Sequence, residues 1–121
     1  YSMKPIEPQP LTPAVFHILL ALMDGDKHGY RIMQAVRANS NGNFEMGPGT
    51  LYGSIKRMLA DDLIIESDER PDPDLDDQRR RYYRLTDRGR QALNADLARM
   101  AFLVQRAKEL RIRPPAGEVS A

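Results

Sequence analysis

The sequence predicts a mainly α protein with a small β-hairpin, in one domain that ends in a long helix. Four segments place apolar residues at helical spacing. Between the third and fourth of them, two short runs rich in β-branched or aromatic residues flank a loop of Pro and Asp, which is typical of a hairpin. A length of 121 residues, with 41% hydrophobic and 29% charged residues, agrees with a single globular domain.

Composition excludes several classes of protein. The chain has no cysteine, which rules out a disulfide framework, a thiol redox switch and a zinc site built on thiolates. No apolar run approaches the roughly 18 residues of a membrane span and no signal peptide is visible, so we expect a cytoplasmic protein without a membrane partner. The net charge of +1 does not by itself indicate a nucleic-acid partner.

The first half of the chain predicts an arm and two helices. Residues 1–10 contain three prolines and are expected to form an extended arm. Thr12 before a proline is typical of a helix start, and the apolar run after it predicts a largely buried helix over 13–23. A second helix is expected over 29–37, followed by an Asn- and Gly-rich turn at 39–43.

The third helix, expected over 48–62, has two different faces. Its apolar stripe consists of Leu51, Ile55, Met58 and Leu59. Its opposite side carries small, hydroxyl and basic groups that suit a DNA groove: Gly49, Thr50, Gly53, Lys56 and Arg57, with Tyr52 on the flank. Because glycine inside a helix costs roughly 1 kcal/mol relative to alanine, Gly53 is expected either to be approached closely by another surface or to be a neutral surface residue.

The second half predicts the hairpin and the final helix. The runs 64–67 and 79–85 are expected to be its strands, and Thr86 the cap of a helix over 87–112, in whose first turn Gly89 is expected to be tolerated. Residues 113–121 are expected to be a disordered tail. Apolar residues of the final helix repeat as in a coiled-coil seam: Leu93, Leu97, Met100, Val104 and Ala107. We expect this seam to pair with a second copy as a two-fold homodimer, or to fold back on its own domain.

Three helices, a hairpin and a further helix are the order of a winged helix-turn-helix domain, here residues 11–86, with a C-terminal dimerisation helix. The chain resembles the PadR family of transcriptional regulators through LTPAVFHILLALMDGDKHGYRIMQAV, GPGTLYGSIKRMLADDLI and RRRYYRLTDRGRQAL. Its HGY, GTLY and YYRLT motifs are specific in combination, and the single final helix resembles the branch with a small C-terminal domain. The resemblance implies a homodimeric repressor that a small effector releases from DNA.

The predicted third helix is the one that enters the major groove in a helix-turn-helix. Lys56 and Arg57 can reach phosphates or guanine edges, and Thr50 can bond a base or a phosphate. Gly49 leaves the amides of the first turn accessible to a phosphate. Tyr52 is expected either at the edge of the core or, following the family pattern, on the DNA backbone.

Further DNA contacts are expected from the second helix and the hairpin. Tyr30 and His28 can face phosphate, although His28 is also typical of a cap or turn residue. Alternation places Arg79 and Arg81 on one strand face and Arg80 on the other, so either face offers an arginine to phosphates or the minor groove. In the alternative interpretation, these arginines are charges that protect an exposed edge strand from aggregation. Acidic residues fill the hairpin loop: Glu66, Asp68, Glu69, Asp72, Asp74, Asp76 and Asp77. We expect that loop to fold away from DNA or to neutralise the arginines when DNA is absent.

The expected partners are double-stranded DNA with a palindromic operator, a second copy of the chain, and a small hydrophobic or aromatic effector. The resemblance implies an effector site near the first and last helices, with Phe16, Met100, Phe102 and Val104 as candidates. The two histidines show no metal-ligand spacing, and no nucleophile–base pair or Gly-rich phosphate loop appears, so we expect no metal, no cofactor and no enzyme. The alternative function is a winged-helix protein-interaction module without operator binding.

Overall fold

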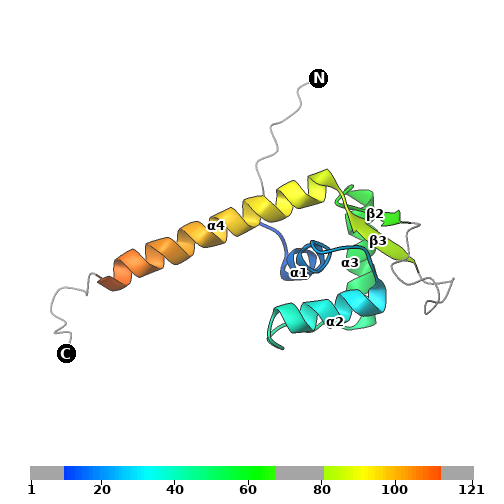
Figure 1. Cartoon of the computed structure of the whole chain (residues 1–121), viewed down its shortest axis with the longest axis horizontal. Coiled ribbons are helices and arrows are strands. Elements are labelled where there is room, and N and C mark those ends of the chain that lie inside the picture. Colours follow the sequence, from blue (N-terminus) through cyan, green and yellow to red (C-terminus); the bar gives the residue numbers. More distant parts are fainter. Residues whose placement is uncertain (1–9, 68–80, 113–121) are drawn as a thin grey trace, which may run out of the picture.

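Four helices and three short strands make up the part of the chain that the computed structural model describes, residues 10–67 and 81–112 (Figure 1). In chain order they are α1 (Pro13–Ala21), β1 (Lys27–His28), α2 (Gly29–Asn39), α3 (Pro48–Ala60), β2 (Ile64–Ser67), β3 (Tyr82–Leu85) and α4 (Asp87–Ile112). The predicted mainly α fold with a small β element is confirmed. Apart from Pro10, the predicted arm and tail lie outside the described residues.

Helix α1 occupies the centre of the domain, where it contacts α2, α3 and α4 (Figure 1). Its start follows the sequence signal, because the Thr12 hydroxyl accepts a hydrogen bond from the Val15 amide at 3.3 Å and a proline follows the cap. Ile18 and Leu19 are completely buried. The helix ends at Ala21, two residues before the predicted end, where a turn leads to β1.

The sheet has three strands in the order β1-β3-β2, both pairs antiparallel. The sequence predicted the hairpin of β2 and β3 but missed the third strand, β1. Strand β1 pairs Lys27 with Tyr83 and His28 with Tyr82, and two residues are too short to show the alternation by which strands are predicted. Strand β3 begins at Tyr82 rather than at residue 79, so Arg81 precedes the strand, while Arg79 and Arg80 lie outside the described residues.

Helix α4 is fixed to the domain at its first turn by close backbone contact. The Thr86 hydroxyl donates to the Asp62 carbonyl at 2.6 Å and accepts from the Gly89 amide at 2.9 Å. A Cβ atom at Gly89 would lie 2.0 Å from the carbonyl oxygen of Leu63, the residue that links α3 to β2. The expectation that Gly89 is merely tolerated was therefore wrong, because the backbone of Leu63 occupies the space of a side chain.

The two halves of α4 have different surroundings. Leu93 belongs to the hydrophobic core and Leu97 packs against its edge. From Met100 to Arg111 every side chain is exposed, and Figure 1 shows this half extending away from the other helices. Within residues 10–67 and 81–112, no helix has the length and hydropathy required to span a membrane.

We expect Gly89→Ala to lower the free energy of unfolding by about 1–3 kcal/mol, because its methyl group would collide with backbone rather than with a movable side chain. Chemical and thermal unfolding followed by circular dichroism measure the change. Arg88→Ala, at the exposed neighbouring position, is the matched control and should stay within about 0.5 kcal/mol. Equal stability of both variants would contradict the close contact.

Candidate nucleic-acid interface

Helix α3 presents one face to the core and the opposite face to solvent. Leu51, Ile55 and Met58 are buried, and Leu59 packs against the core, so the predicted apolar stripe is confirmed. Six residues expected to contact DNA lie on the exposed face of the same helix: Gly49, Thr50, Tyr52, Gly53, Lys56 and Arg57. The burial of one side thus fixes which side chains the helix offers to a partner.

The exposed face of α3 is open and positively charged. Lys56 and Arg57 form no ion pair with any other residue in the described ranges. Gly47 is the N-cap of α3 and has no side chain that could accept a hydrogen bond. The backbone N–H groups of the first turn can therefore donate to a ligand. Cβ atoms built at Gly49 and Gly53 would meet nothing within 4 Å. Another surface can therefore approach the α3 backbone closely at both positions.

Tyr52 connects α3 with the start of α2. Its side chain is directed toward Gly29, where a Cβ atom would lie 2.3 Å from the Tyr52 hydroxyl oxygen. Only glycine leaves room for this contact without moving the tyrosine. Tyr52 nevertheless remains 51% exposed, so it combines the edge-of-core position with an accessible ring.

At the start of α2, His28 and Tyr30 have different surroundings. The His28 Nδ1 atom accepts a hydrogen bond from the Arg31 amide at 3.4 Å, which confirms its interpretation as a cap. Its ring packs edge-on against Tyr82 with the centroids 5.3 Å apart, and only 7% of the residue is exposed. His28 thus positions α2 and β3 and does not present its ring to solvent, whereas Tyr30 is exposed.

We call β2, β3 and the segment between them the wing. A partly buried ion pair fixes it to the turn between α1 and β1: Arg84 donates to the two carboxylate oxygens of Asp26 at 3.2 and 2.9 Å, and Ser67 donates to Asp26 at 2.7 Å. Burial alone would raise the pKa of Asp26, but these hydrogen bonds and the positive charges of Arg84 and Lys27 outweigh it and lower the pKa. Sequence reasoning missed Asp26, because its partners are distant along the chain.

Arg81 is the one of the three predicted wing arginines that the structure describes. Its Nη1 atom donates to Glu66 Oε1 at 2.9 Å, and both side chains remain accessible to solvent. The acidic loop from Asp68 onward lies outside the described residues. Glu66, on β2 before that loop, thus neutralises one wing arginine, and the two expectations for the loop itself stay predictions.

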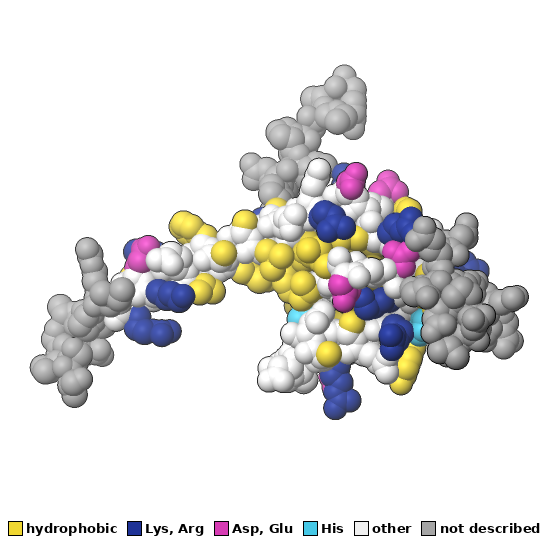
Figure 2. Space-filling model, in the orientation of Figure 1, with side chains coloured by type: hydrophobic (Ala, Val, Ile, Leu, Met, Phe, Trp, Pro, Cys, Tyr) yellow, Lys and Arg dark blue, Asp and Glu magenta, His cyan; other side chains and the backbone are white. Residues whose placement is uncertain are grey.

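The predicted α4 seam is divided between the core and the surface. Leu93 is completely buried within its own protomer, so its assignment to a dimer interface was wrong; the core already occupies that side of the helix. Met100, Val104 and Ala107 are exposed. The exposed apolar surface of this half also includes Phe102, Leu103 and Leu110. Figure 2 shows hydrophobic side chains along α4 and beneath it.

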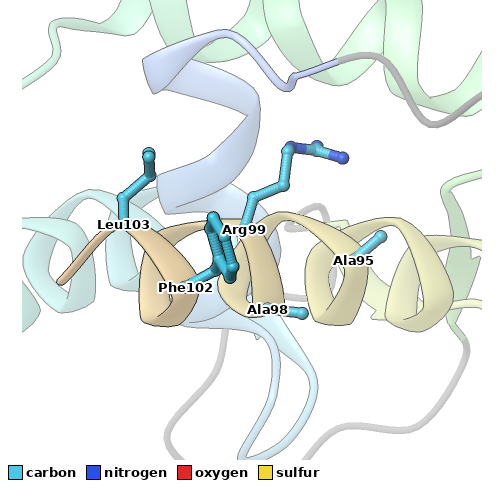
Figure 3. Close-up of a pocket in the computed structure, with 5 residues that line it drawn as sticks. All are labelled: Ala95, Ala98, Arg99, Phe102 and Leu103. Carbon is cyan, nitrogen blue, oxygen red and sulfur yellow. The ribbon is translucent and has the colours of Figure 1, made fainter. Parts of the chain in front are cut away.

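A shallow hollow of about 460 Å³ lies on α4 and is lined by Ala95, Ala98, Arg99, Phe102 and Leu103 (Figure 3). Of the predicted effector residues, only Phe102 lines it. Phe16 packs against the core and meets the His17 ring edge-on, which places it away from this hollow's lining. His17 stacks on Phe44, and burial lowers the pKa of its imidazole. Among the residues of the described ranges, no group of three or more His, Asp or Glu side chains could hold a metal ion.

Comparison with known proteins identifies related regulators. Residues 18–95 match the transcriptional regulator PadR-like family. The chain is 38% identical over 80 residues to the transcriptional regulator Rv3488 of Mycobacterium tuberculosis, covering 66% of this chain and 68% of that protein. It is 36% identical over 92 residues to an uncharacterized 37.1 kDa protein of a Streptomyces fradiae transposon, covering 76% of this chain but only 24% of that protein.

The fold matches almost the whole length of a solved structure. A PadR family transcription regulator from Clostridium difficile aligns with a TM-score of 0.66 and 24% identity, covering 82% of this chain and 98% of that one. The predicted winged helix-turn-helix with a C-terminal helix is confirmed, as is the expectation of a transcriptional regulator rather than an enzyme.

We expect Asp26→Asn to lower the free energy of unfolding by about 1–2 kcal/mol at neutral pH, because Arg84 loses a charged acceptor. The pKa of Asp26 is lower in the folded chain than its unfolded value of about 3.9. The stabilisation is therefore complete above about pH 5, declines below pH 4, and is lost as the pH falls through the folded pKa.

Urea unfolding of the wild type and Asp26→Asn at pH 7, 5, 4 and 3 measures this difference. Asp61→Asn is the control, because that carboxylate is exposed and has no ion pair with another described residue. A stability difference that stays constant from pH 7 to pH 3 would contradict the role of the ionised carboxylate.

Proposed function

The chain belongs to the transcriptional regulator PadR-like family, and from this premise we propose that it binds a palindromic DNA operator as a homodimer and represses transcription. The observation that carries the proposal is the exposed face of α3, which combines small, hydroxyl and unpaired basic residues on a helix held by buried apolar ones. A surface of this composition matches the major groove, whose phosphates attract cations and whose base edges offer hydrogen-bond partners.

In the proposed complex α3 lies in the major groove. Lys56 and Arg57 bind phosphates or guanine edges, and Thr50 bonds a base or a phosphate. Gly49 and Gly53 allow the helix backbone to approach the bases, since nothing in the protomer fills the space beside them. Tyr52, Tyr30 and the wing contact the flanking backbone.

The outer half of α4 supplies the proposed dimer interface. At 1.5 Å per residue, the 26 residues of α4 are about 39 Å long, and the side chains from Met100 to Arg111 have no cover from their own protomer. Five large apolar residues are exposed there: Met100, Phe102, Leu103, Val104 and Leu110. Burying each one stabilises an assembly by about 1.5–3 kcal/mol. Four of them, Met100, Leu103, Val104 and Leu110, lie within about 120° of one another around α4, and a second copy that offers this face in return gives a closed two-fold dimer.

We place the effector in the hollow on α4, next to the proposed dimer interface. Two alanines leave space there, Phe102 and Leu103 supply apolar surface, and Arg99, which forms an ion pair with Asp96, lies at the border (Figure 3). A small aromatic or apolar molecule fits this chemistry. Its binding would shift the two protomers relative to each other and relieve repression.

We expect Lys56→Ala and Arg57→Ala each to weaken operator binding roughly tenfold, because each removes a cation from the groove-facing side of α3. Gly53→Ala should raise helix stability by about 1 kcal/mol and yet weaken DNA binding, because its methyl group enters the space that the DNA requires. Fluorescence anisotropy with a duplex from the promoter of its own operon measures affinity, and thermal unfolding measures stability.

Lys108→Ala is the control for charge, because Lys108 is exposed on the outer half of α4. Equal affinity for the promoter and a shuffled duplex would refute sequence-specific binding. Absence of salt-dependent DNA binding would instead favour the protein-interaction module that uses the same surface.

We expect Leu103→Glu to convert the dimer into monomers at micromolar concentration, because it places a charge within the apolar face of α4. Sedimentation equilibrium measures the change. Gln105→Glu adds the same charge about 200° around the helix and should leave the dimer intact. A monomeric wild type, or equal dissociation of both variants, would refute the proposed interface.

A further inference from the structure

We propose that Glu66 is an internal competitor of DNA phosphate that limits the affinity of this protein for DNA by holding the guanidinium of Arg81. This inference rests on the proposed DNA-binding function and adds to it a residue that weakens binding. The two side chains belong to the wing, which in the proposed complex contacts the DNA backbone beside α3.

The strand register places Glu66 beside the recognition surface. Glu66 pairs with Tyr83 across β2 and β3, and directly paired residues share one face of a sheet. Arg81 is two residues before Tyr83, which puts its side chain on that same face. Tyr83 is buried in the core, and β2 contacts α3, so the Glu66–Arg81 pair lies on the face of the sheet that packs toward α3.

The pair is accessible and easily exchanged. The side chain of Arg81 is 70% exposed and that of Glu66 46%, and a single hydrogen bond of 2.9 Å joins them. An exposed pair of this kind contributes little to stability, whereas a phosphate can bind a guanidinium through two parallel hydrogen bonds. The other described wing arginine, Arg84, differs: Asp26 holds it through two bonds, and the Asp26 side chain is largely buried. Of the two wing arginines in the described residues, Arg81 is thus the one that can change partners.

Glu66 opposes DNA binding in two ways. Before binding it cancels the charge of Arg81, so the pair contributes no net cation to the attraction of the duplex. After Arg81 turns to a phosphate, the carboxylate of Glu66 remains beside the negatively charged backbone. Glutamine at position 66 would keep an oxygen acceptor for Arg81 and remove both effects.

We expect Glu66→Gln to raise DNA affinity three- to tenfold at low salt, with the slope of log affinity against log salt steeper by about one. Anisotropy titrations over a series of salt concentrations measure both quantities. Glu109→Gln is the matched control, because it removes the same charge from another exposed pair, Arg106–Glu109, on the side of α4 about 180° from Met100 and from the proposed dimer face. It should leave affinity and slope near the wild-type values.

The variant Arg81→Ala separates this inference from a general effect of net charge. In the Arg81→Ala background, Glu66→Gln should give little or no gain, since the released cation is missing. A wild type that binds DNA with the same affinity and slope as Glu66→Gln would overturn the inference alone, as would an equal gain in the Arg81→Ala background. Failure of both the wild type and Glu66→Gln to bind DNA would overturn the proposed function, and this inference with it. Thermal unfolding verifies that each variant is folded.

Discussion

Burial of the apolar side of α3 is the interaction on which the rest of this structure depends. Leu51 and Met58 are almost completely enclosed by the domain, so rotation of α3 about its axis would expose apolar surface and bury Lys56 and Arg57. The same packing that stabilises the core therefore determines the outward direction of the basic groups. Core residues and interface residues alternate every few positions along this helix. A change in how α3 packs would therefore also change which side chains it presents to a partner.

Charged hydrogen bonds, in addition to apolar burial, fix the position of the wing. Its strands are short, and its position depends on the charged hydrogen bonds of Asp26 with Arg84 and Ser67, which connect it to the turn after α1. Asp26 joins both strands of the wing to the turn after α1, while Glu66 neutralises Arg81. One carboxylate is structural and the other is exchangeable, because only the first is shielded from water.

Local patterns predicted the helices well and tertiary contacts poorly. The cap at Thr12 and the two faces of α3 follow from signals within one or two turns of the chain, and the structure contains both. Strand β1 exists only because β3 lies beside it, and no pattern in two residues indicates that partner. Gly89 and Leu93 were misjudged for the same reason: the backbone of Leu63 and the core around α4 come from distant parts of the sequence. The Asp26 and Glu66 pairs likewise depend on strand register.

Helix α3 carries few unpaired cations, so the proposed dimer would be needed to raise the affinity for DNA. One protomer offers Lys56 and Arg57 on this helix, while Arg81 and Arg84 of the wing are each held by a carboxylate. A single copy should therefore bind DNA weakly, and linking two copies multiplies the affinity only if both helices reach their half-sites together. Because the outer half of α4 would set that spacing, a small displacement at the hollow near Phe102 would be enough to remove the gain from linkage. Weak individual contacts would thus make the proposed dimeric complex responsive to an effector, whereas stronger binding by each copy would make its affinity insensitive to the spacing.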